Sequence, residues 1–107
     1  MTDEILSNYP EVTAIFTYND QLAVSSYYAI QMRGLKIPDD ISIIGYDNIE
    51  LASLIKPKLT TIEQPKYDMG KNAAELLIKR IRDNKKTIPQ TILLPTQLVI
   101  RESTRQI

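Results

Sequence analysis

The side chains best suited to chemistry in this chain follow two apolar runs. Asp47 comes directly after the run "ISIIGY" at residues 41–46, and Asn19 follows the β-branched run "VTAIFT" at residues 12–17. An amide side chain both donates and accepts hydrogen bonds, whereas an ionised carboxylate only accepts, and does so strongly. An amide and a carboxylate side by side would suit a polyhydroxylated or heteroatom-rich small molecule.

These residues also have other interpretations. Asp-Asn is common in turns, so Asp47 could simply bond its own backbone. Asp20 is expected to cap the helix that follows it rather than to contact a ligand. A third interpretation is an α/β enzyme in which Asp20 and Asp47 form an acid pair or hold Mg²⁺, but the sequence shows no accompanying nucleophile or phosphate-binding loop.

The composition excludes several classes of function. The chain has no Cys and no His, which rules out a Cys nucleophile, a Ser-His-Asp triad and a Cys/His zinc site. Its three glycines are too scattered for a phosphate-binding loop, and its net charge of zero gives no overall field to attract nucleic acid. We therefore expect no enzyme activity, no cofactor, no metal and no DNA contact by this chain itself.

The order of the elements explains how Asn19 and Asp47 could meet. A strand at residues 12–17, a helix at residues 20–33 that ends at Gly34, and a strand at residues 41–46 form a βαβ unit. Adjacent strands of a parallel sheet end at the same edge, where open α/β sheets bind ligands. The sequence therefore predicts an α/β fold, with a parallel sheet flanked by helices and a ligand site at its carboxyl edge.

The second half of the chain predicts one extended segment, one helix and two closing strands. The segment "LTTI" spans residues 59–62, and the closing strands are expected at "TILL" (91–94) and "QLVIRE" (97–102). Basic residues at 79–86 are expected to form a solvated helix end. The helix expected between "LTTI" and "TILL" has an apolar stripe that is predicted to be buried: Met69, Ala73, Leu76, Leu77 and Ile81.

The helix at residues 20–33 has two apolar faces. One face should lie on the sheet and comprises Leu22, Ala23, Ser26, Tyr27 and Ile30. Val24, Tyr28 and Met32 form a second stripe roughly 100° further round. A surface helix needs only one apolar face, so the second stripe, with the apolar loop "LASLI" at 51–55, is either further core or a subunit interface.

Four motifs carry a resemblance to a known family. They are ND-x-x-A at residues 19–23, "GLKIPDDISIIGYDN" at 34–48, P-x-LTTI at 57–62 and "QPKYDMG" at 64–70. Together and in this order, they make residues 12–103 resemble the C-terminal part of LacI/GalR-type transcriptional repressors.

The resemblance implies a two-lobed effector-sensing core like that of periplasmic sugar-binding proteins. Asn19, Asp47 and, at the hinge, Gln64 would line the effector cleft. Residues 1–58 would belong to the C-terminal lobe, 59–64 to a hinge crossing, 65–88 to a helix of the N-terminal lobe, and 89–107 to terminal strands that return to the C-terminal lobe.

The resemblance also implies partners and location. The protein would be cytoplasmic, with no membrane association, and would sense a sugar or related metabolite. Operator DNA would be bound only through a helix-turn-helix headpiece that this chain does not contain. Homodimer contacts would fall at Ala23, Val24, Tyr27, Tyr28, Leu51, Leu54 and Ile55.

A periplasmic solute-binding protein of a sugar transporter is the alternative, because it shares the two lobes. Tyr46-Asp47-Asn48 together with P-x-LTTI favours the repressor.

Overall fold

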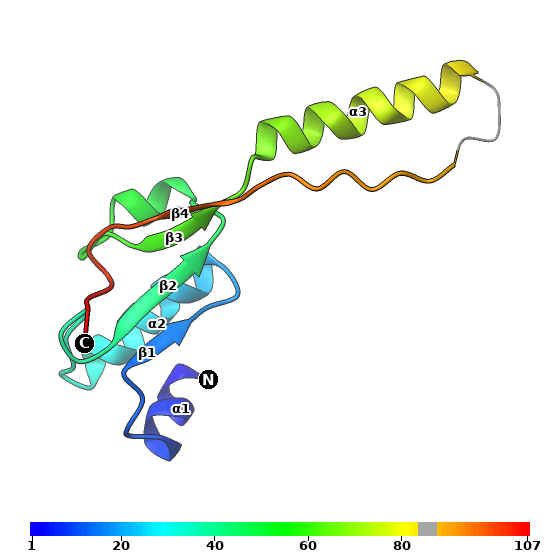
Figure 1. Cartoon of the computed structure of the whole chain (residues 1–107). Helices are drawn as coiled ribbons and strands as arrows, with labels where there is room; N and C mark the ends of the chain where they lie inside the picture. Colours follow the sequence, from blue (N-terminus) through cyan, green and yellow to red (C-terminus); the bar gives the residue numbers. More distant parts are fainter. Residues whose placement is uncertain (84–87) are drawn as a thin grey trace. The chain divides into compact units, whose positions relative to one another are not determined.

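A computed structural model describes residues 1–83 and 88–107 (Figure 1). The chain divides into two compact units, one formed by Met1–Glu63 and Gln97–Ile107 and the other by Gln64–Thr96. In chain order the described elements are α1 (Thr2–Asn8), β1 (Ala14–Phe16), α2 (Asp20–Met32), β2 (Ser42–Tyr46), the 3₁₀ helix η1 (Glu50–Ser53), β3 (Thr60–Glu63), α3 (Lys66–Asp83) and β4 (Gln97–Val99).

The first unit is built on a four-stranded sheet with the order β1-β2-β3-β4. β1, β2 and β3 are parallel, and their arrowheads point the same way in Figure 1. β4 runs antiparallel to β3. The predicted α/β fold with a parallel sheet and flanking helices is confirmed, and β1-α2-β2 is its βαβ unit.

The N-cap of α2 lies one residue earlier than the sequence indicated. Asn19 is the N-cap: its backbone is extended, and its side-chain oxygen accepts a hydrogen bond from the Leu22 N–H at 2.9 Å. Asp20 is the first helical residue, so the prediction that Asp20 caps the helix is wrong. With the cap supplied by Asn19, the Asp20 carboxylate turns to the sheet instead. Gly34 follows the helix with a φ of +74°, a conformation that glycine adopts without strain.

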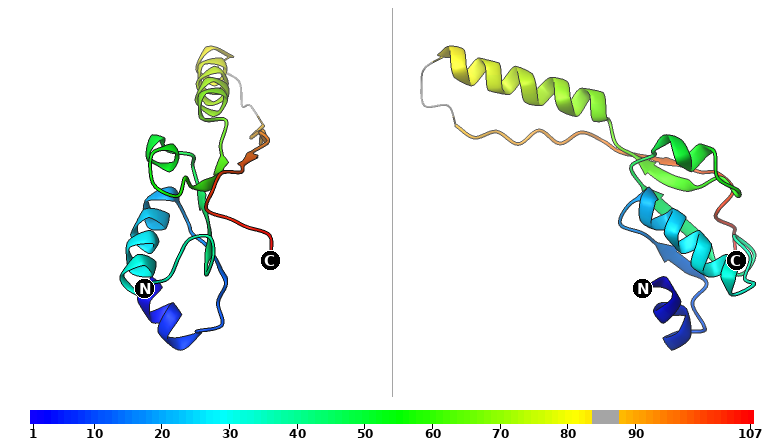
Figure 2. Two further views of the ribbon diagram at one scale, coloured as in Figure 1. Left: turned by 90° about the vertical axis from the view of Figure 1, so that its left-hand side faces the viewer. Right: turned by 180° about the vertical axis from the view of Figure 1, so that it is seen from behind.

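One face of α2 packs on the sheet, as both views of Figure 2 show. Ala23, Ser26, Tyr27 and Ile30 are buried as predicted, but Leu22 is 38% exposed, so its predicted place against the sheet is wrong. The core has eight buried apolar residues: Leu6, Ala23, Tyr27, Ile30, Ile41, Ile43, Ala52 and Leu59. Ala23 and Tyr27 are enclosed in this core, and their assignment to a dimer interface stays a prediction.

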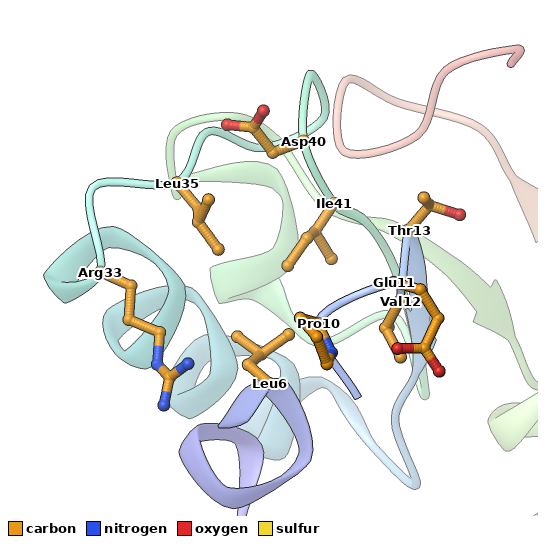
Figure 3. Close-up of a pocket in the computed structure, with 9 residues that line it drawn as sticks. All are labelled: Leu6, Pro10, Glu11, Val12, Thr13, Arg33, Leu35, Asp40 and Ile41. Atoms are coloured by element: carbon orange, nitrogen blue, oxygen red, sulfur yellow. The ribbon is translucent and has the colours of Figure 1, made fainter. Parts of the chain in front are cut away.

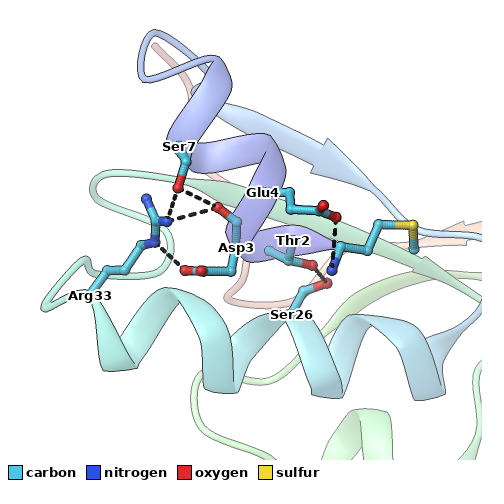
Figure 4. A network of polar contacts seen from close by, with 7 residues as sticks. Thr2, Asp3, Glu4, Ser7, Ser26 and Arg33 are labelled. Atoms are coloured by element: carbon cyan, nitrogen blue, oxygen red, sulfur yellow. Dashed lines mark hydrogen bonds and ion pairs between the residues drawn. The ribbon is translucent and has the colours of Figure 1, made fainter.

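α1 is held on α2 by a polar network (Figure 4). Arg33 donates from Nε to Asp3 Oδ1 at 2.5 Å and from Nη2 to the Asp3 carbonyl at 2.7 Å, and it also contacts Ser7. Thr2 and Ser26 join the two helices through their hydroxyls. The hydrogen bond and the positive charge of Arg33 lower the pKa of the Asp3 carboxyl. α1 is thereby tied to α2, whose other face covers the sheet.

The second unit differs from the sequence prediction. α3 forms as expected, but it has no buried residue, and Leu77 and Ile81 are 60% and 68% exposed. The prediction of a buried stripe at Met69, Ala73, Leu76, Leu77 and Ile81 is therefore wrong for this chain. Periodicity shows which face of a helix is apolar, but burial also needs a surface to pack against.

The two closing strands are only partly present. "TILL" at residues 91–94 is not a strand, which corrects the prediction, and of "QLVIRE" only Gln97–Val99 pairs, with β3. A strand requires a hydrogen-bonded neighbour, and Gln97–Val99 has one in β3. Lys85 and Lys86 of the predicted basic helix end lie outside the described residues.

The buried phenol of Tyr27 gives a test of this packing. Its hydroxyl donates to the Pro57 carbonyl at 3.0 Å, and burial raises its pKa from 10.0 to about 12. Tyr27→Phe removes this hydrogen bond, so we expect a loss of about 1 kcal/mol in unfolding free energy at pH 7.

The pH dependence distinguishes this hydrogen bond from general loosening of the core. The folded protein keeps the Tyr27 proton at pH values where the unfolded chain releases it, so its contribution is complete below pH 10 and is lost as the pH rises through 12. Urea unfolding should therefore show the difference between wild type and Tyr27→Phe narrowing over this interval. A constant difference would contradict the account.

Candidate functional site

The parallel sheet brings Asn19 and Asp47 to the same edge. Phe16 at the end of β1 is in register with Ile44 of β2, and the Thr17 N–H continues the pairing by donating to the Ile44 carbonyl at 2.9 Å. Asn19 and Asp47 follow these two strand ends, at the carboxyl edge. Gln64 follows β3 directly but belongs to the second compact unit, so its place in a site stays a prediction.

Asp47 and Asn48 form a turn with an uncommon backbone conformation. Their φ angles are +109° and +51°. Asp and Asn enter the left-handed region more readily than other non-glycine residues, but such a conformation still costs on the order of 1–3 kcal/mol. The surrounding structure must therefore hold this turn in place.

Three successive backbone N–H groups hold the turn. Asp47 donates to the Ile62 carbonyl of β3 at 2.9 Å. Asn48 donates to the Thr61 hydroxyl oxygen at 3.3 Å, and Ile49 donates to Asp20 Oδ2 at 2.9 Å. Two of the three acceptors are side chains that come from α2 and β3.

Asp20 joins these contacts from the interior. Its side chain is 0% exposed, and Oδ1 accepts a 2.6 Å hydrogen bond from the Thr61 hydroxyl. The carboxylate lies directly over Gly45 of β2: a Cβ at that position would be 2.1 Å from Asp20 Oδ1. Only glycine leaves room for the carboxylate on the sheet.

Arg101 supports the same turn from the C-terminal segment. It donates from Nη2 to Asn48 Oδ1 at 2.7 Å and from Nη1 to the Leu59 carbonyl at 2.9 Å. Sequence reasoning missed Arg101, Thr61 and the anchoring role of Asp20. No local pattern marks them, because their partners lie far away in the chain.

Comparison with known proteins agrees with this architecture. Residues 2–104 match the model of the periplasmic binding protein-like domain. The chain belongs to this family. The sequence-based resemblance to the effector-binding part of LacI/GalR repressors is confirmed by the relatives that this periplasmic binding protein-like chain matches.

Three relatives illustrate the match. The HTH-type transcriptional repressor PurR of Vibrio vulnificus is 46% identical over 105 residues, which are 98% of this chain and 31% of that protein. The ribose operon repressor of Haemophilus influenzae is 46% identical over 99 residues, 92% of this chain and 30% of the repressor. The structure of a LacI family transcriptional regulator from Enterococcus faecium with bound ribose matches with a TM-score of 0.81 at 40% identity, covering 96% of this chain and 39% of the regulator.

The chain thus spans about a third of the length of the curated relatives it matches. Those relatives are repressors by name, not enzymes. Within residues 1–83 and 88–107, no helix is long and apolar enough to cross a membrane.

The burial of Asp20 removes one alternative for this periplasmic binding protein-like chain. An acid pair or a Mg²⁺ site made by Asp20 and Asp47 needs a carboxylate that a substrate or ion can reach. Asp20 is fully enclosed, and both of its oxygens accept hydrogen bonds from protein groups. Its role is therefore structural.

The amino edge of the sheet has a hollow of about 690 Å³ (Figure 3). It is lined by Leu6, Pro10, Glu11, Val12, Thr13, Arg33, Leu35, Asp40 and Ile41. Thr13 and Ile41 precede β1 and β2, which places the hollow at the edge opposite Asn19 and Asp47. It contains none of the residues predicted to bind a ligand.

The other residues predicted for a dimer interface lie at or near the surface. Tyr28 is 68% exposed and Leu54 is 63% exposed, and Leu51 is also exposed. Val24 is partly buried, and Ile55 packs against the core. These five residues stay a predicted interface.

The contact between Asp20 and Gly45 predicts the effect of a single methyl group. Gly45→Ala should lower the unfolding free energy by about 1–3 kcal/mol, because the new Cβ displaces the Asp20 carboxylate or moves the strand. Thermal unfolding followed by circular dichroism measures this change.

Gly70→Ala is the matched control. Apart from its chain neighbours and the backbone of its own helix, no described atom lies within 4 Å of the Cβ that it would add, and alanine favours a helix more than glycine does. We expect this variant to keep or raise stability. Equal stability of Gly45→Ala and wild type would contradict the close packing described at Gly45.

Proposed function

We propose that this chain is part of the effector-sensing core of a LacI/GalR-type transcriptional regulator, and that it binds a small sugar at the carboxyl edge of its sheet. The observation that carries the proposal is the turn at Asp47. A strained turn held by three hydrogen bonds, next to Asn19 at a parallel-sheet edge, is the arrangement expected of a ligand site.

The two side chains have complementary roles in this proposal. Asn19 Oδ1 already accepts from the Leu22 N–H, so the side-chain nitrogen of Asn19 is the group that would donate to a ligand oxygen. The Asp47 carboxylate would accept from ligand hydroxyl groups through charge-assisted hydrogen bonds. Such a pair recognises adjacent hydroxyl groups, as found in a sugar.

Ribose is the first ligand to test. One relative at 46% identity is named for the ribose operon, and a structural neighbour at 40% identity contains bound ribose. Gln64 would add a further contact at the hinge after β3.

The remaining assignments describe the intact regulator. Residues 1–58 and 89–107 would belong to the C-terminal lobe, 65–88 to the N-terminal lobe, and 59–64 to the hinge between them. The regulator would act in the cytoplasm without catalysing a reaction. It would dimerise through the surface of Val24, Tyr28, Leu51, Leu54 and Ile55, and bind operator DNA through a separate headpiece. A sugar would change operator affinity by binding one lobe arrangement more tightly than another.

The alternative is a periplasmic solute-binding protein of a sugar transporter. The repressor relatives that match most of this chain favour the regulator instead.

Asp47→Asn tests the proposal, because asparagine also tolerates a positive φ and keeps the shape of the side chain. We expect about 1.5–3 kcal/mol less binding free energy for ribose, roughly 10- to 100-fold weaker affinity, because an ionised acceptor becomes neutral. Isothermal titration of the intact protein that contains this chain measures it.

Asp39→Asn is the control, since Asp39 is an exposed acid in the segment before β2, away from the carboxyl edge. It should leave ribose affinity unchanged. If Asp47→Asn binds ribose as tightly as wild type does, Asp47 is only a turn residue.

A further inference from the structure

The Asp47–Asn48 turn is held by side chains from three separate parts of the chain. Asp20 comes from the first turn of α2, Thr61 from β3 and Arg101 from the segment after β4. Asp20 and Thr61 lie 41 residues apart, and Arg101 lies 53 residues from Asn48.

We propose that Asp20, Thr61 and Arg101 are positioning residues that set the affinity of the ligand site by holding the Asp47–Asn48 turn in its left-handed conformation. This inference rests on the proposed function for its ligand readout. Its structural part concerns only the turn and is tested without a ligand.

Burial separates these residues from the binding residues. Asp20 and Thr61 are both 0% exposed, so neither can touch a ligand at the sheet edge. Asp20 accepts from the Ile49 N–H and from Thr61, while Thr61 accepts from the Asn48 N–H. The buried carboxylate therefore reaches the turn in two ways, directly at Ile49 and through the Thr61 hydroxyl at Asn48.

These polar groups fix the direction in which the backbone N–H groups of the turn point. A buried carboxylate loses hydration, and apolar side chains of the same volume often join two elements equally well. Apolar contacts, however, do not fix the orientation of a backbone N–H group. Hydrogen bonds to Asn48 and Ile49 do, and they fix the residues directly after Asp47.

Arg101 also bonds the turn, from the segment that follows β4. Its planar guanidinium bonds Asn48 Oδ1 and the Leu59 carbonyl at the same time. A lysine keeps the charge but lacks the fork needed for both contacts. Arg101→Lys, at a partly exposed position, is therefore a variant that should fold.

The experiment compares Thr61→Val with Thr61→Ser in the intact protein. Valine keeps the shape and removes the hydroxyl, whereas serine keeps the hydroxyl. Two quantities are measured: amide hydrogen exchange at Asn48 and Ile49, and ribose affinity by isothermal titration.

We expect Thr61→Val to exchange at least tenfold faster at Asn48 and Ile49, and to bind ribose roughly tenfold more weakly. Thr61→Ser should restore both quantities to near the wild-type values. Arg101→Lys should also weaken ribose binding, with faster exchange at Asn48.

Ile30→Val is the control for a general loss of stability, because Ile30 is fully buried on α2 and is not part of the turn network. It should lower the unfolding free energy without changing exchange at Asn48 relative to β2 or changing ribose affinity. If Ile30→Val and Thr61→Val have the same effects, the positioning role is wrong.

The two readouts separate this inference from the proposed function. If wild type does not bind ribose but the Asn48 and Ile49 amides exchange faster in Thr61→Val, the ribose proposal fails. The positioning of the turn by Thr61 is then supported. If ribose binds and those amides exchange equally in Thr61→Val and Thr61→Ser, the positioning inference is overturned and the proposed function stands.

Discussion

The buried carboxylate of Asp20 is the contact on which the carboxyl edge of this protein depends. It lies over Gly45, where even one methyl group would collide with it. Its two oxygens accept from Thr61 on β3 and from the backbone after β2. One side chain on α2 therefore connects a helix, two neighbouring strands and the turn that presents Asp47.

Adjacent residues divide two tasks at the start of α2. Asn19 satisfies a backbone N–H of the first helical turn, which frees Asp20 from capping. Asp20 then points to the sheet, where its charge is held by a hydroxyl and an amide. The Asn-Asp pair thus serves both helix initiation and the order of the carboxyl edge of the sheet. This explains why one residue of the pair is proposed to contact a ligand and the other to act through the turn.

The sequence predicted the features that depend on local patterns. β-Branched runs and a capped helix indicated the βαβ unit, and from it the meeting of Asn19 and Asp47 at one edge. It assigned the cap to Asp20 instead of Asn19, because both residue types are good caps and their positions differ by one. It could not reveal Thr61 or Arg101, because their roles arise from contacts across 41 and 53 residues. The apolar stripe of α3 was recognised, but its burial depends on a surface that periodicity does not describe.

The most direct test of this account is a map of the backbone amide shifts that ribose causes in ¹⁵N-labelled intact protein. The account predicts that the largest shifts fall at Asn19 and at Asp47 to Ile49, on the carboxyl edge. Shifts confined to the amino edge, around Thr13, Leu35 and Ile41, would contradict it, because they would place the ligand at the opposite end of the sheet.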